Sequence, residues 1–189
     1  PYYLQVMDKV QGGLRELFRT TNRMTFAVSG TGSAGMEATV VNLIEPGDSM
    51  VIGVNGVFGG RMTDVAARAG ANVTKVERPW GEVFTPEEIK KAVDAAKPKV
   101  VGIVMAETST GVYQPIEEIA KIVLDAGALL LVDAVTSLGG VPVEVDKWGI
   151  DAIYSGTQKC LSCPPGLAPV SFNQRAMDVI MARKSKVQS

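Results

Sequence analysis

Hydrophobic residues recur along the chain at two spacings, and the spacing changes from one segment to the next. Over residues 4–18 apolar side chains return every three or four positions, which predicts an amphipathic helix. Similar patterns, bounded by glycine, proline or aspartate, predict further helices over 34–43, 58–69, 86–97 and 116–125. Short apolar runs predict strands over 24–28, 49–53, 72–76, 100–105, 128–132 and 150–154.

Strands and helices alternate, and the strands are apolar throughout instead of alternating with polar residues. Such strands are buried on both faces, so we predict an α/β fold of three layers, with helices on both sides of a mostly parallel sheet. Ligands bind to sheets of this kind at the carboxyl ends of the strands. Small, hydroxyl-bearing or charged residues follow the predicted strands at 29–35, 55–58, 107–111, 133–137 and 155–159.

Composition narrows the choice of partners. The 189 residues include 19 basic and 20 acidic side chains, and no basic block stands out, so neither nucleic acid nor an anionic membrane is an expected partner. No apolar run approaches the roughly 20 residues that cross a bilayer, and the first residues lack the pattern of a signal peptide. We therefore expect a cytoplasmic protein.

The chain contains no histidine, which excludes Ser-His and Cys-His nucleophile pairs within it. Cys160 and Cys163 have the C-x-x-C spacing of redox and zinc sites. A zinc site needs four ligands and the chain has no further cysteine, while prolines follow this pair at once. We expect two free thiols and no metal site.

Two nucleotide-binding motifs are matched only in part. Gly30, Gly32 and Gly35 have the G-x-G-x-x-G spacing of dinucleotide-binding folds, but no acid ends the next strand to hold a ribose. The turn is either a packing device or a phosphate site built from helix N–H groups and the hydroxyls of Thr31 and Ser33. Asp133 ends an apolar strand as in a Walker B motif, yet the chain has no P-loop.

Lys159 follows the strand at 150–154 and is either a solvated loop charge or an amine nucleophile. Pyridoxal phosphate requires a lysine for its aldehyde, an acid for its ring nitrogen, a flat apolar cover and donors for its phosphate. Each need is met by a different part of the chain: the amine by Lys159, the acid by Asp133, the apolar cover by Phe58, and the phosphate donors by the turn at 29–35. Their coincidence favours a pyridoxal phosphate site with Lys159 as nucleophile.

Several longer motifs then carry a family resemblance: V-S-G-T-G at 28–32, E-P-G-D at 45–48, N-G-V-F-G at 55–59, E-T-S-T-G at 107–111, L-V-D-A-V-T-S-L-G-G at 131–140 and Y-S-G-T-Q-K at 154–159. From about Tyr3 to its end the chain resembles the large domain of class V aminotransferases, which are pyridoxal phosphate-dependent transferases of fold type I. Within that family it is most similar to the alanine–glyoxylate and serine–pyruvate branch. The resemblance implies that residues 1–189 are an incomplete large domain, without the N-terminal arm and the small C-terminal domain.

The resemblance also implies a role for each site residue. Lys159 would form the Schiff base and move the substrate Cα proton, and Asp133 would pair with the ring nitrogen. Phe58 would stack on the ring where vertebrate relatives have tryptophan, Val135 would pack beneath it, and Thr108 would bond near its hydroxyl. The phosphate would be held by Thr31, Gly32, Ser33 and Gln158.

The implied reaction moves an amino group from alanine or serine to a 2-oxo acid such as glyoxylate or pyruvate, in a homodimer. Two alternatives stay open. A desulfurase or lyase would use the same cofactor, but such enzymes have histidine before the lysine and over the ring, where this chain has Gln158 and Phe58. The second alternative is a remnant that binds cofactor or a partner without turnover.

Overall fold

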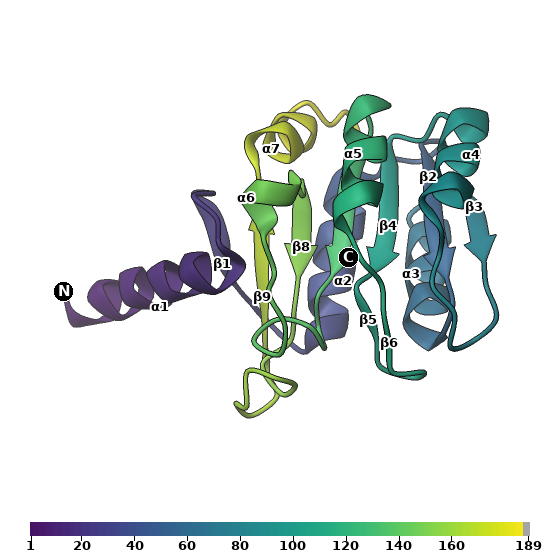
Figure 1. Cartoon of the computed structure of the whole chain (residues 1–189). Coiled ribbons are helices and arrows are strands. Elements are labelled where there is room, and N and C mark those ends of the chain that lie inside the picture. Colours follow the sequence, from purple (N-terminus) through teal and green to yellow (C-terminus); the bar gives the residue numbers. More distant parts are fainter. Residues whose placement is uncertain (187–189) are drawn as a thin grey trace.

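The computed structural model describes residues 1–186 as one mixed α/β unit (Figure 1). Its helices are α1 (Tyr2–Phe18), α2 (Gly32–Leu43), α3 (Val57–Arg68), α4 (Pro86–Ala96), α5 (Glu117–Asp125), α6 (Val145–Trp148) and α7 (Gln174–Met181). Its strands are β1 (Met24–Ser29), β2 (Ser49–Val54), β3 (Asn72–Glu77), β4 (Val100–Val104), β5 (Ala106–Glu107), β6 (Val112–Tyr113), β7 (Leu129–Asp133), β8 (Ala152–Tyr154) and β9 (Leu167–Phe172).

A seven-stranded sheet forms the middle layer, in the order β1-β9-β8-β7-β4-β2-β3. The pairings between β3, β2, β4, β7 and β8 are all parallel, and only β9 runs against its two neighbours. The predicted mostly parallel sheet is therefore confirmed. Since β1 and β8 both pair antiparallel with β9, they run in the same direction and end at the same edge of the sheet.

Alternate side chains of the central strands enter two different cores. Leu130 and Val132 of β7 join a cluster with α4 and α5, whereas Leu129 and Leu131 join a cluster with α2 and α3. Figure 1 shows α4 and α5 in front of the sheet and α2 and α3 behind it. Continuous apolar runs are explained by this arrangement, because both faces of each central strand are buried.

Local signals predicted most boundaries within two residues. The capping box of α4 is present: Glu88 N–H donates to Thr85 Oγ1 at 3.3 Å, and Thr85 N–H donates to Glu88 Oε2 at 2.9 Å. The β5–β6 hairpin, α6, β9 and α7 were not predicted. α2 begins at Gly32 instead of residue 34, so the glycine turn supplies the first turn of the helix itself.

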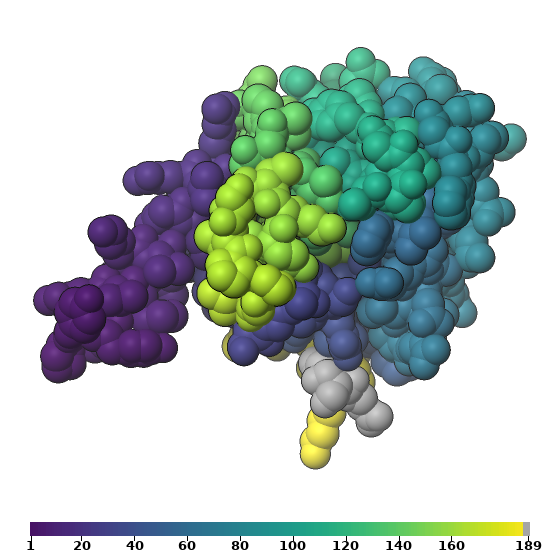
Figure 2. All heavy atoms as spheres, turned by 90° about the horizontal axis from the view of Figure 1, so that it is seen from below, coloured from purple at the N-terminus to yellow at the C-terminus, as the bar shows by residue number. Residues whose placement is uncertain are grey.

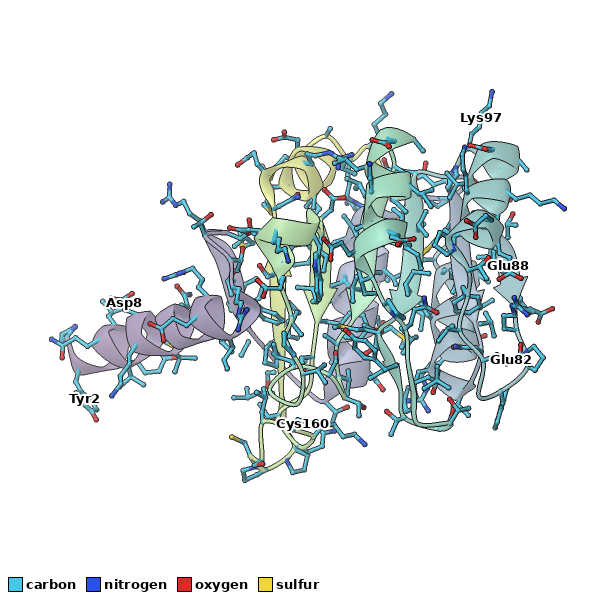
Figure 3. The ribbon with its side chains drawn as sticks, viewed as in Figure 1. Tyr2, Asp8, Glu82, Glu88, Lys97 and Cys160 are labelled. Carbon is cyan, nitrogen blue, oxygen red and sulfur yellow. The ribbon has the colours of Figure 1, made fainter. Side chains whose placement is uncertain are left out.

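The first helix protrudes from the body of the protein (Figure 1). Leu14 and Phe18 at its inner end are buried, while Tyr2, labelled at the outer end in Figure 3, is 79% exposed. Among the described residues, no helix combines the length and the apolar character that a membrane crossing requires.

Candidate active site

A cavity of about 250 Å³ lies where the chain leaves several parallel strands. Its lining comes from the ends of β7 and β8 and the first turns of α2 and α3, and consists of Thr31, Gly32, Ser33, Met36, Phe58, Arg61, Asp133, Val135, Tyr154, Gln158 and Lys159. Figure 2 views this edge, with the loop after β8 in yellow-green beside the dark-blue start of α2. The cavity brings together every predicted site residue except Thr108.

A larger hollow of about 660 Å³ lies between the starts of α4 and α5. It is lined by residues 83–86 and by side chains around the start of α5, and includes none of the predicted site residues. The smaller cavity is the candidate active site because it alone, of these two, combines an amine, a buried carboxylate and a helix N-terminus.

The N-terminus of α2 forms one part of the cavity. Thr31 precedes the helix in an extended conformation, and the first backbone bond runs from Ala34 N–H to Thr31 O at 2.8 Å. The N–H groups of Gly32 and Ser33 precede that bond and have no partner within the helix, which makes this turn suited to an anion. Gly32 also permits a close approach, since a Cβ here would lie 2.8 Å from Val135 Cγ2.

Gln158 lies beside this helix start. A Cβ built on Gly156 would be 3.0 Å from Gln158 Oε1 and 3.3 Å from Gly32 N. The absence of a side chain at Gly156 therefore lets Gln158 and the start of α2 pack closely against this part of the backbone. Gln158 Oε1 is buried and has no hydrogen-bond partner among the described residues. Buried polar atoms are nearly always paired, so this amide indicates a place for a polar ligand.

Asp133 ends β7 and is only 2% exposed. Its Oδ1 accepts the N–H of Val135 at 2.9 Å, and its Oδ2 accepts the hydroxyl of Tyr154 at 2.7 Å. The parallel register places Asp133 directly opposite Tyr154 on β8. Burial raises the pKa of Asp133 to about 6, against the opposing effect of its two donors, and the nearby Glu107 adds to the increase.

Glu107 holds the start of α3 in place. This carboxylate is 1% exposed, and its Oε2 accepts the N–H groups of Phe58 at 3.0 Å and Gly59 at 3.3 Å. Its Oε1 accepts both the N–H and the hydroxyl of Ser109. A Cβ on Gly56 would lie 2.3 Å from Glu107 Cγ, so the contact requires glycine there. The position of Phe58 in the cavity therefore depends on Glu107.

Arg61 follows Phe58 by one helical turn and reaches the same cavity. Its Nη1 donates to Ser33 Oγ at 3.0 Å, and its Cζ lies 5.2 Å from the centre of the Phe58 ring. The guanidinium therefore connects the start of α3 with the start of α2.

Lys159 lies in the turn that follows β8, where Thr157 N–H donates to Leu167 O at 3.1 Å and Ser162 N–H donates to Lys159 O at 3.0 Å. Its amine takes part in none of the hydrogen bonds or ion pairs found within residues 1–186. The backbone thus fixes the turn, while the amine is left without a partner among these residues. Cys160, labelled at the lower edge in Figure 3, is a free thiol that donates to Thr136 O at 3.1 Å, and Cys163 is also free.

Thr108 does not line the cavity. Its Oγ1 lies 2.5 Å from Thr136 Oγ1, so its hydroxyl bonds to the loop after β7. Met36, Arg61 and Tyr154 line the cavity without having been predicted, and Glu107 was predicted only as part of a strand-end segment. Arg61 could have been found, because it is three residues from Phe58 on a predicted helix and so shares its face.

Comparison with known proteins identifies the family. Residues 2–184 match the family model described as aminotransferase class-V. The chain is 46% identical over 184 residues to the (S)-ureidoglycine–glyoxylate transaminase of Bacillus subtilis, covering 97% of this chain and 44% of that protein. It is 42% identical over 182 residues to the alanine–glyoxylate aminotransferase of Rattus norvegicus, covering 96% of this chain and 44% of that protein.

Solved structures agree with this result. The crystal structure of an alanine–glyoxylate aminotransferase from Nostoc sp. superposes with a TM-score of 0.98 at 48% identity, covering all of this chain and 50% of that one. The chain thus spans about half the length of the relatives it matches. With a family model that extends over nearly all of its residues, the chain belongs to the class V aminotransferases.

Proposed function

We propose that the protein is a pyridoxal phosphate-dependent aminotransferase that moves an amino group from alanine or serine to a 2-oxo acid such as glyoxylate or pyruvate. Relatives named for amino transfer to glyoxylate support this choice of acceptor. The observation that carries the proposal is a single cavity that contains the amine of Lys159, the buried carboxylate of Asp133 and the N-terminus of α2.

The residues of the cavity fit pyridoxal phosphate. The N–H groups of Gly32 and Ser33, which have no acceptor within α2, suit a phosphate group. Gln158 can present its amide NH₂ to the same anion once its terminal amide turns over, because Oε1 has no donor among the described residues to hold it in place. Asp133 is an acid held by two donors, of the kind that a protonated ring nitrogen requires. Phe58 and Val135 offer the apolar surface that a flat ring needs.

When bound, the cofactor would supply an aldehyde that condenses with amines and a ring that accepts electrons from the substrate Cα. Lys159 Nζ would hold the aldehyde carbon in the absence of substrate, and would then take the proton from the substrate Cα and deliver it to that same cofactor carbon. Asp133 would keep a proton on the ring nitrogen through its negative charge. Tyr154 and Val135 fix the orientation of that carboxylate.

The proposal is tested by adding pyridoxal phosphate to the protein and recording its absorbance. We expect a new absorbance band from an imine between the cofactor and the protein. Borohydride should reduce this imine to a stable amine, which removes the band and leaves the added mass on the peptide that contains Lys159. Lys159→Ala should abolish both, whereas Lys90→Ala, at a lysine paired with Asp94 on the exposed surface of α4, should change neither. A band that survives in Lys159→Ala would contradict the assignment.

Amino transfer is then separated from the alternatives by adding alanine or serine to the loaded protein. An aminotransferase converts the cofactor to its amine form and regains the first spectrum when glyoxylate or pyruvate is added. Release of sulfide from cysteine, or of ammonia without an acceptor, would indicate a desulfurase or lyase. Binding without any spectral change on adding amino acids would indicate a protein without turnover.

A further inference from the structure

Arg61 lies in the cavity, and neither the family motifs nor the strand-end pattern gave it a role. We propose that Arg61 is the cationic ligand of the cofactor's phosphate group. The inference rests on the proposed function, because it concerns how the same cavity holds pyridoxal phosphate.

The geometry places the guanidinium at the phosphate-binding turn. Arg61 Nη1 donates to the hydroxyl of Ser33, the second residue of α2, at 3.0 Å. The backbone N–H of the same residue is one of the two unpaired donors at the helix start. An anion held by that N–H group and by the neighbouring Gly32 therefore lies beside the guanidinium, which has five N–H donors and uses one on Ser33.

The guanidinium is oriented but not neutralised. The ring of Phe58 lies under it at 5.2 Å, and within the described chain no carboxylate forms an ion pair with Arg61. Arg68, two turns further along α3, shows the contrasting case, since its Nε is 2.8 Å from Asp64 Oδ2. Arg61 is thus held in position by a hydroxyl and a ring, with its charge available to a ligand.

The charges of the cavity lining lead to the same assignment. A phosphate monoester carries a charge of about −1.5 to −2 near neutral pH. Three charged side chains line the cavity: Lys159, Asp133 and Arg61. The carboxylate of Asp133 is negative and would repel a phosphate, and the amine of Lys159 is committed to the cofactor's aldehyde. Arg61 is the remaining cation, and arginine is well suited to phosphate because it can donate two parallel hydrogen bonds.

The test compares two ligands that differ at the phosphate. Pyridoxal phosphate and 5′-deoxypyridoxal share the ring and the aldehyde, but the second carries a methyl group in place of the phosphate ester. Each is titrated into cofactor-free protein, and the dissociation constant is read from the absorbance change. For Arg61→Gln we expect affinity for pyridoxal phosphate to fall about 10- to 100-fold, the range of a hydrogen bond to a charged group. Affinity for 5′-deoxypyridoxal should stay within about 2-fold.

Matched variants make the result specific. Arg68→Gln removes the same charge from the same helix outside the cavity and should leave both dissociation constants unchanged. Arg61→Lys keeps the charge and should recover part of the lost affinity. Equal losses for both ligands would overturn the inference and assign Arg61 to the support of Phe58. Unchanged cofactor affinity with a raised KM for the amino acid would also overturn it, in favour of the substrate carboxylate. If the wild-type protein binds neither ligand, the proposed function itself fails.

Discussion

Asp133 makes the stability of the cofactor-free protein depend on pH in an unusual direction. Burial raises the pKa of this carboxyl from 3.8 to about 6. A carboxyl with a higher pKa in the folded protein keeps its proton there after the unfolded chain has lost it. Between these two pKa values the folded protein binds more protons, so its free energy of unfolding falls as the pH rises.

The magnitude follows from the size of the pKa increase. One pKa unit corresponds to about 1.4 kcal/mol, so an increase of about two units weakens the folded state by about 3 kcal/mol once both states are ionised. Most of this loss falls between about pH 4 and pH 7. Asp133→Asn removes the charge but retains the hydrogen bonds, because the amide oxygen can accept from Val135 while the Tyr154 hydroxyl turns to accept from the amide nitrogen.

Urea unfolding of the cofactor-free wild type and of Asp133→Asn, at several pH values, measures the effect. The free energy of unfolding of the variant should gain about 2 to 3 kcal/mol relative to wild type between pH 4 and pH 7. Tyr154→Phe removes a hydroxyl that lowers the pKa of Asp133, so in this variant the decline should extend to higher pH. A difference between wild type and Asp133→Asn that does not vary with pH would refute the reasoning.

Three further predictions concern side chains that support the candidate site or the fold around it. Glu107→Ala leaves buried N–H groups at the start of α3 without an acceptor, so it should lower the free energy of unfolding, measured in urea, by roughly 3 kcal/mol. Glu107→Gln keeps an acceptor and should lose less. Equal losses for the two variants would contradict the capping role of Glu107. Asp151→Ala leaves the guanidinium of Arg175 without its buried partner, so the free energy of unfolding should fall by roughly 3 kcal/mol in the same assay. Asp64→Ala removes an exposed partner of Arg68 and should lower it by less than about 1 kcal/mol. Phe58→Ala should weaken the binding of both pyridoxal phosphate and 5′-deoxypyridoxal, by about 3- to 10-fold or more in absorbance titrations. A loss confined to the phosphate ester would exclude ring stacking.

Local chemistry was sufficient to predict much of this fold. The threonine, proline and glutamates at the start of α4 form the expected cap, and the apolar runs of β4 and β7 lie in the centre of a parallel sheet. β9 escaped prediction because its six residues include Pro169 and one of its two partners, β1, lies near the other end of the chain. Whether such a segment joins a sheet depends on residues far from it, which a local pattern does not contain.

In the candidate site, too, some features follow from local sequence and others depend on residues that are distant in the chain. The approach of Lys159 to Asp133 was predictable because Asp133 ends β7, Lys159 follows the end of β8, and parallel strands bring their ends to one edge of a sheet. The hydroxyl of Tyr154 reaches Asp133 only because the register of β7 and β8 sets the two residues opposite each other. The contact of Arg61 with Ser33 likewise depends on how two helices pack, a relation that no single segment of sequence expresses.

The position of β9 between β1 and β8 also sets the order in which the site can form. The hydroxyls of Thr25 on β1 and Ser171 on β9 lie 2.8 Å apart, yet the residues are separated by 146 positions in the chain. Among the described strands, β1, which leads into α2, pairs only with β9, so this pairing has to wait until the ribosome has released residue 172. Pairings of such high contact order form slowly, so the candidate site is completed only after β9 has joined β1.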